Sequence, residues 1–339
     1  MRAIAQWLVA GQAAIAQGDP VANLHHDPIR PFDFNNSGYI ERESDSETLE
    51  LKWNPGEVDV TSLTNRTKFK MDYGPEDFDG SPIEYATGPL VQDLTQWSQE
   101  LRATGDTDLM TWTTGVFYLD IDQTGSTGFN FPVLSGTDFA FNSFNDIEQT
   151  TETYAVFGQA EWNLSEKLLL TTGARYTHDE IKFKSLAFYN ELGNGYDGGT
   201  GSTVFDPPLL VADFQASTVG GLATQSEGLW SGKLQLDYTV ADDNLVYGSV
   251  SRGVKGPGFN SNIDGSLPND SIPFDSESMI AYELGNKAYF LDRRLRVNSS
   301  AYFYDYKDFQ GFAFVGTQGQ VSNYDGEYYG GELEISAVL

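Results

Sequence analysis

Few residues in this chain occur in the combinations that metal binding requires. His25 and His26, followed by Asp27, form the one adjacent histidine pair. Adjacent residues of an extended chain point to opposite sides, so the two rings are poorly placed to share an ion. The chain also has no cysteine that could complete a zinc site. We therefore expect a surface loop here, with no metal and no cofactor.

A glycine-rich stretch could be mistaken for a nucleotide-binding loop. Gly253, Gly256 and Gly258 lie close together, but Lys255 stands inside the run and no helical pattern follows. A phosphate-binding loop needs its lysine after the glycines and a helix behind them. The segment 252–255 could instead offer positive charge to an anionic ligand at the base of a loop. We favour the other interpretation, the inward-facing end of a strand.

Several charged side chains alternate with apolar neighbours. No nucleophile or oxyanion hole is evident beside them, so an acid–base catalytic site is a weak hypothesis and we expect no enzyme activity. On the polar side of strands, they would pair with one another or with a domain inside the sheet. These residues are Glu161, Arg175, Asp237, Glu283, Lys287 and Arg296.

A cluster of phenylalanines is the strongest candidate for ligand binding. It occupies a stretch that we expect to be a loop, where so much apolar surface usually marks a binding site. A loop folded back into the molecule would explain the cluster equally well. The candidate residues are Phe129, Phe131, Phe139, Phe141 and Phe144.

Strands must position these residues, because apolar side chains recur at every second position. Residues 154–162 place Tyr154, Val156 and Trp162 on one side and polar residues on the other. Residues 168–179 show the same alternation after the short turn at 164–167. A period of two is typical of a strand with one apolar and one polar face.

The same unit recurs along the chain, always with a short turn at one end and a long connection at the other. Trp53, Trp162, Tyr238 and Phe290 each precede a short turn, as an interfacial aromatic belt would require. The long connections are expected at 73–94, 121–149, 184–227, 255–277 and 308–326. The eleven expected strands are 47–53, 58–72, 95–104, 108–120, 150–163, 167–183, 228–240, 244–254, 278–290, 294–307 and 327–338.

Composition and strand length favour a membrane barrel. The net charge of −29 disfavours nucleic acid as a partner. Aromatic residues make up 14% of the chain, which argues against disorder and suits the aromatic girdles of a barrel. A soluble sandwich would have shorter strands with turn signals at both ends. The predicted class is all-β, an antiparallel transmembrane β-barrel, with about 11 strands of a larger up-and-down barrel in this chain.

A series of motifs in residues 45–339 resembles TonB-dependent outer-membrane receptors, most closely those of the ferric-siderophore type. Each motif alone is ordinary strand sequence, but their order and spacing match the middle of that family's barrel. The motifs are Ser98–Arg102, Tyr154–Trp162, Gly173–Glu180, Tyr247–Asn260, Tyr282–Gly285 with Leu291–Leu295, and Tyr302–Phe309.

This resemblance implies a 22-stranded barrel in the bacterial outer membrane, closed by a plug domain. It implies uptake of a scarce ligand, most of all a ferric siderophore, driven by the TonB energy-coupling complex through a plug that this chain lacks. We expect an N-terminal loop or amphipathic segment over residues 1–45 and a partial outer-membrane barrel over residues 46–339. Such a segment, in contact with outer-membrane lipids, is not expected to transport alone.

Two other functions stay open on the sequence alone. One is a passive porin-like barrel without energy coupling. The other is a soluble, secreted β protein that binds carbohydrate. The first would lack a plug domain, and the second would fold in water without detergent.

Overall fold

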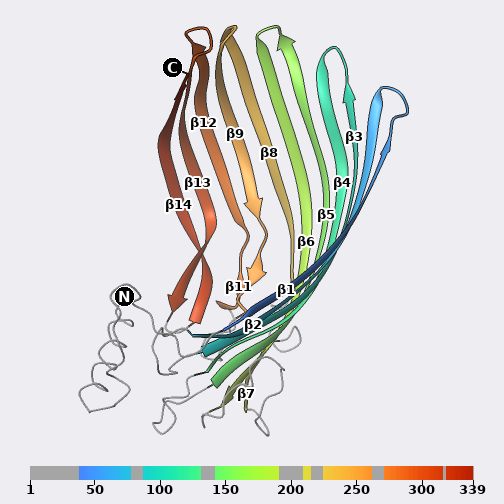
Figure 1. The fold of residues 1–339 in the computed structure, drawn as a ribbon, viewed down its shortest axis with the longest axis vertical. Coiled ribbons are helices and arrows are strands. Elements are labelled where there is room, and N and C mark those ends of the chain that lie inside the picture. Colours follow the sequence, from blue (N-terminus) through green and yellow to red (C-terminus); the bar gives the residue numbers. More distant parts are fainter. Residues whose placement is uncertain are drawn as a thin grey trace, which may run out of the picture.

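The computed structural model shows one long antiparallel sheet, curved into an open trough (Figure 1). It describes residues 38–77, 87–130, 142–190, 209–214, 224–261, 271–315 and 318–338. Within these ranges no helix is long and apolar enough to cross a membrane. The strands pair in the order β1-β2-β3-β4-β5-β6-β8-β9-β12-β13-β14, with β7 beside β6. The short β10 and β11 pair with each other.

The eleven strands of the main path correspond to the eleven predicted strands, and the antiparallel class is confirmed. Each main-path strand also extends beyond its predicted range at one or both ends. The strands are β1 (Ile40–Trp53), β2 (Val58–Asp77), β3 (Thr87–Asp106), β4 (Met110–Asn130), β5 (Asn142–Ser165), β6 (Leu168–Asn190), β7 (Leu209–Phe214), β8 (Thr224–Ala241), β9 (Asn244–Lys255), β10 (Gly258–Phe259), β11 (Pro273–Phe274), β12 (Glu277–Phe290), β13 (Leu295–Val315) and β14 (Gln318–Ala337).

Short turns join the strands at one end of the trough, and their sequences explain why they are tight. Between β1 and β2, the Gly56 amide donates to Asn54 Oδ1 at 2.9 Å, and the φ of Gly56 is 132°. Between β12 and β13, Leu291, Asp292 and Arg293 all adopt positive φ values. Five hairpin turns of this kind lie side by side at the top of Figure 1.

The two faces of the sheet differ in chemistry. Alternate residues of β8 show this, because Leu234 and Leu236 are exposed on one face while Asp237 is buried on the other. Side chains on the concave side of a curved sheet converge and shield one another, whereas those on the convex side spread apart. The convex face is therefore the apolar, exposed one, and the concave face carries the polar residues.

Aromatic rings border the apolar band of the convex face along both of its margins, one near the short turns and one farther along the strands. Near the short turns, Trp53 and Phe290 are exposed, as the predicted belt requires. At the other level, Tyr118 lies between Trp97 (5.5 Å between ring centres) and Tyr154 (4.9 Å). An exposed apolar band between two aromatic rows is the surface that a lipid bilayer requires of a barrel.

Farther from the short turns than the aromatic row of Trp97, Tyr118 and Tyr154, the convex face becomes charged. Asp120 of β4, Glu152 of β5 and Glu180 of β6 are directly opposite one another in the register. Carboxylates in this position belong in water rather than in hydrocarbon. Only the part of each strand between the short turns and the row of Trp97, Tyr118 and Tyr154 therefore spans the bilayer.

Three of the predicted long connections, 73–94, 121–149 and 308–326, are shorter than predicted, because strands fill most of each one. The clearest case is 308–326, where β13 continues to Val315 and β14 begins at Gln318. The register shifts between Tyr306 and Phe309, and Asp308 has a φ of 55°. A β-bulge of this kind changes which residues face inward, so the period-two pattern breaks although the strand continues.

Candidate functional site

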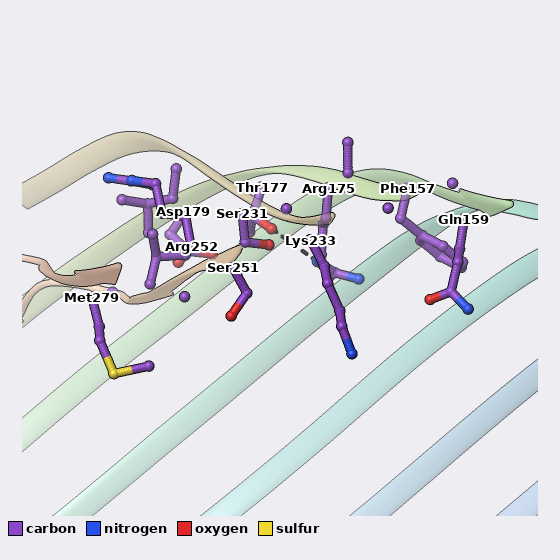
Figure 2. A pocket seen from close by; sticks show the side chains of 18 residues that line it. Phe157, Gln159, Arg175, Thr177, Asp179, Ser231, Lys233, Ser251, Arg252 and Met279 are labelled. Carbon is purple, nitrogen blue, oxygen red and sulfur yellow. Dashed lines mark hydrogen bonds between the residues drawn. The ribbon is translucent and has the colours of Figure 1, made fainter. Parts of the chain in front are cut away.

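The concave wall of the sheet is hollowed near its middle (Figure 2). The hollow has a volume of about 650 Å³ and opens to the inside of the trough. It is formed by β5, β6, β8, β9 and β12, and its floor is lined by small residues. The polar and charged side chains around it include Gln159, Arg175, Thr177, Asp179, Ser231, Lys233 and Ser251.

Arg175 is held in place from several sides. Its guanidinium carbon lies 5.4 Å from the ring centre of Phe117 and 5.7 Å from that of Phe157. Its Nε donates to Thr177 Oγ1 at 3.0 Å. Two aromatic contacts and one hydrogen bond fix the direction of the side chain. The two terminal nitrogens of the guanidinium are not used by these contacts.

Lys233 supplies a second positive charge in the same hollow. It is opposite Gly173 in the register, and Ser231 is opposite Arg175. Lys233 and Arg175 are therefore diagonal neighbours on adjacent strands and share one face, an arrangement that typically separates Cβ atoms by roughly 7–8 Å. Neither residue forms an ion pair with a carboxylate among the described residues.

The segment between β9 and β12 turns inward and lies against the part of the concave face away from the short turns (Figure 1). We call its described residues, 256–261 and 271–276, the ledge. Asn260 is buried and donates from Nδ2 to the carbonyls of Ser271 (3.1 Å) and Val321 (3.0 Å). Its Oδ1 accepts a bond from the Val321 amide at 2.7 Å. Asn260 thus fastens the ledge to β14.

Further contacts fasten the ledge to the remaining strands. Gln310 of β13 donates to the carbonyls of Gly256 (2.7 Å) and Asp275 (3.0 Å). Gln225 of β8 donates to the Gly258 carbonyl at 2.6 Å. On the β6 side, the rings of Phe183 and Phe259 stack at 4.9 Å. The ledge therefore bridges the inner wall from β6 to β14, directly beside the hollow that Gly256 borders.

The ledge and the strand beside it, β6, form a tightly packed cluster. Ile272 is only 1% exposed, and Phe183 is 4% exposed. A barrel wall one sheet thick has no interior of its own, so a buried apolar cluster marks a place where another segment covers the wall. The ledge is consequently a fixed part of the concave surface.

Polar residues predicted to face inward do form networks on the concave wall. Asp237 accepts bonds from Gln235 Nε2 at 2.9 and 3.0 Å. Tyr247 donates to Glu283, and Lys287 Nζ lies 5.5 Å from the Tyr247 ring centre. On β13 and β14, Arg296 pairs with Glu334, and Glu161 of β5 is exposed. The partners are other side chains of the same wall, and none of these contacts joins two of the six predicted residues.

The favoured interpretation of segment 252–255 is only partly right. Arg252 donates to the Trp230 carbonyl and stacks on the Trp230 ring, 4.4 Å from its centre, on the convex face. Lys255 ends β9 on the opposite face. Successive residues of a strand alternate, so the two cations of this segment cannot act together.

The phenylalanine cluster is only partly within the described residues. Phe129 and Phe144 lie on β4 and β5, not in a loop, and their register partners are Ser143 and Gly128. Phe131, Phe139 and Phe141 are outside the described residues, as is the His25–His26 pair. The binding role of the cluster stays a prediction.

Sequence reasoning missed the ledge and the partnership of Arg175 with Lys233. The sequence places Gly256–Asn260 in a long connection and in one of the family motifs, and excludes it as a nucleotide-binding loop. Its Pro257 and Gly258, which interrupt the alternation, are the signal that the chain leaves the sheet there. Within the described ranges, no group of three or more histidine or acidic side chains is arranged to hold a metal ion.

The curved antiparallel sheet, with its lipid-type convex band and polar concave wall, defines the wall of a transmembrane β-barrel. The family model described as "TonB dependent receptor-like, beta-barrel" matches residues 10–338. The chain therefore belongs to the TonB-dependent receptor β-barrel family, and its location is the bacterial outer membrane.

Known relatives agree with this assignment. A pesticin receptor from Yersinia enterocolitica is 27% identical over 237 residues, which cover 67% of this chain and 29% of that protein. The chain thus spans less than a third of this relative. Among solved structures, the ferric yersiniabactin uptake receptor FyuA from Yersinia pestis has a TM-score of 0.65 at 21% identity. That match covers 88% of this chain and 40% of FyuA.

Two other solved structures share the fold. The copper transporter OprC has a TM-score of 0.61 at 17% identity, covering 88% of this chain and 44% of OprC. The ferric-catecholate import receptor Fiu from E. coli K12 has a TM-score of 0.57 at 14% identity, covering 97% of this chain and 48% of Fiu. At these identities the likeness concerns the barrel fold.

Proposed function

We propose that this chain is part of the barrel wall of an outer-membrane receptor that imports a scarce ligand, most of all a ferric siderophore. The hollow on the concave wall, beside the fixed ledge, is the observation that carries this proposal. It is roughly the size of pockets that take drug-sized molecules. The names of several relatives, which refer to ferric siderophore uptake, support the same class of ligand.

The energy for uptake would come from the TonB complex of the inner membrane. In this proposal the complex acts on a plug domain held inside the barrel, against the polar networks of the concave wall. Membership of a TonB-dependent family favours this active mechanism over a passive porin or a soluble carbohydrate-binding protein.

The phenylalanine cluster is proposed to contact the ligand at the mouth. Phe129 and Phe144 stand near the far ends of β4 and β5, well beyond the charged row on the convex face. This places their backbone at the outer opening, where a ligand arrives first. Replacing Phe129 and Phe144 with alanine should weaken ligand binding while leaving the barrel folded.

Uptake of radiolabelled iron by whole cells tests the proposed function. The full-length receptor that contains this chain is expressed in a strain that lacks its own ferric-siderophore receptors, and a panel of ferric siderophores is supplied. The proposal expects accumulation of iron from at least one of them, abolished by a proton ionophore. Accumulation that persists in ionophore-treated cells, or no accumulation from any chelate, would contradict it.

A further inference from the structure

We infer that Arg175 and Lys233 form an anion-binding site on the inner wall, and that the transported ligand is engaged there through negatively charged oxygens. The inference rests on the proposed function and adds the charge class of its ligand. Carboxylate, catecholate or phenolate oxygens of a metal chelate are groups of the required kind. Two features of the described sheet define the site. One is the hollow, and the other is the pair Arg175 and Lys233, neither of which forms an ion pair with a described carboxylate.

Three other cations of the concave wall show how this pair differs from them. Arg102 pairs with Glu100 at 3.3 Å, and Arg296 pairs with Glu334. Lys287 lies over the Tyr247 ring, which itself donates to Glu283. Arg102 and Arg296 are thus neutralised by carboxylates of their own wall, and Lys287 is held by an aromatic ring. Arg175 and Lys233 stand together in a strongly acidic chain, and no described carboxylate forms an ion pair with either of them.

The carboxylate nearest in the sheet is already engaged. Asp179 lines the same hollow, and its Oδ1 accepts a hydrogen bond from Thr153 at 2.7 Å. Thr153 is buried, so this bond is shielded from water. Gly256 of the ledge also closes in on Asp179, because a Cβ at Gly256 would lie 3.0 Å from Asp179 Oδ2. The carboxylate of Asp179 therefore makes its contacts where the ledge meets the wall.

Arg175 is preorganised for a bidentate contact. The rings of Phe117 and Phe157 and the bond to Thr177 hold its guanidinium, which leaves the two terminal nitrogens free for paired oxygens. Such fork-shaped contacts to carboxylate-like groups are among the stronger hydrogen bonds in proteins. Lys233 is exposed and flexible, so it can follow an anion of variable shape.

The position of Arg175 and Lys233 fits an intermediate binding site on the route of a ligand through the barrel. The hollow borders the ledge through Gly256 and lies within the part of the sheet that spans the bilayer. A ligand that passes the ledge on its way inward must pass this wall. Small neighbours such as Gly158, Gly173 and Gly232 leave the volume of about 650 Å³ open beside the two cations.

Binding of two classes of ferric chelate to the purified full-length protein tests the inference. The probes are anionic chelates, ferric citrate and a ferric tricatecholate, and a neutral ferric trihydroxamate. The variants are Arg175→Gln, Lys233→Gln and the double substitution. Arg102→Gln is the matched control, because it removes the same charge from the concave wall outside the hollow.

We expect the double variant to bind an anionic chelate about tenfold or more weakly, as the loss of charged hydrogen bonds would predict. Binding of the neutral chelate should change little, and Arg102→Gln should resemble the wild type with both probes. Iron uptake by energised cells is measured separately. A protein that binds the anionic chelate but does not import it supports this site and contradicts the proposed transport.

Three results would overturn the inference. The first is wild-type protein that binds no anionic chelate. The second is an equal loss of affinity for the anionic and neutral chelates in the double variant, which would indicate that the pair holds the plug domain. The third is an unchanged affinity for the anionic chelate in that variant.

Discussion

At the scale of single residues, Asn260 contributes more to the concave surface than any charged group there. One buried amide makes three hydrogen bonds that join the ledge to itself and to β14. No other side chain of similar size could replace both the donor and the acceptor. The conformation of the ledge therefore depends on this residue.

Replacing Asn260 with alanine should loosen the ledge without unfolding the sheet. The change leaves the buried Val321 amide without its partner, at a cost of about 1–3 kcal/mol. Hydrogen exchange of residues 258–260 and 271–274 should become faster, while β8 and β9 keep their protection. Asn298→Ala, which removes a single bond to Glu334, is the control. Unchanged exchange in the ledge would show that Asn260 does not hold it.

A second prediction at this scale concerns the ion pair beside the β13 bulge, outside the bilayer. Lys307 Nζ lies 3.0 Å from Asp325 Oδ2, and the Asp308 amide donates to Asp325 Oδ1. The bond from Lys307 is the main reason that the pKa of Asp325 is lowered. The same bond raises the pKa of Lys307.

The stabilisation of the bulge should therefore be lost at both extremes of pH. A lowered pKa of Asp325 gives stability that disappears as pH falls below about 3.8. A raised pKa of Lys307 gives stability that disappears as pH rises above about 10.5. The protection factor of the Asp308 amide measures this and should be constant between these limits. In Asp325→Asn the loss on the acid side should vanish, and a titration near neutral pH would contradict the assignment.

At the scale of the element, each strand has a segment in lipid and a segment beyond it. The lipid segment of β8 exposes Leu234 and Leu236 on its convex face. A lysine on this face near the middle of the bilayer costs about 2–4 kcal/mol in barrels. Leu236→Lys should therefore lower the free energy of unfolding from lipid vesicles by roughly that amount.

The neighbouring position provides the matched control for this substitution. Gln235 lies on the concave face, one residue away, so Gln235→Lys adds the same charge on the water-facing side. Urea titration of the refolded protein should give a much smaller loss for this variant. Equal losses at both positions would show that the convex face of β8 does not contact lipid.

The sequence predicts the part of each strand that contacts lipid better than the part that extends beyond the bilayer. Next to the short turns, the convex face must be apolar and the alternation reveals every main-path strand. Beyond Asp120 and Glu152 both faces are polar, so β4 and β5 continue without a periodic signal. The bulge at Asp308 hides the rest of β13 for a different reason, since it reverses the alternation.

The candidate site was less predictable than the strands. Its sequence marks Arg175 as a polar-face residue, but the contact with Phe117 and the diagonal to Lys233 depend on the register of four strands, β4, β5, β6 and β8. Residues 191–223 separate β6 from β8 along the chain, and the length of this connection does not specify which residues pair. The ledge depends on contacts that are still more distant in sequence, such as Gln310 with Gly256.

At the scale of the whole molecule, the sheet is a wall that needs more of its family's barrel to enclose a lumen. β1 and β14 are edges of the described sheet, and unpaired backbone groups are costly in lipid. The chain spans about 40% of the length of FyuA. We expect further strands to close the barrel at both edges, with the anion site and the ledge facing the enclosed space.

The most direct test of this account is chemical labelling of single cysteines in native outer membranes. The natural chain has no cysteine, so each label reports one position. Cysteines replace Lys233, Leu234, Gln235 and Leu236 in turn, and each variant reacts with a water-soluble maleimide. The account predicts labelling at 233 and 235 and protection at 234 and 236. Equal labelling at all four positions would contradict a wall with lipid on one face and a watery lumen on the other.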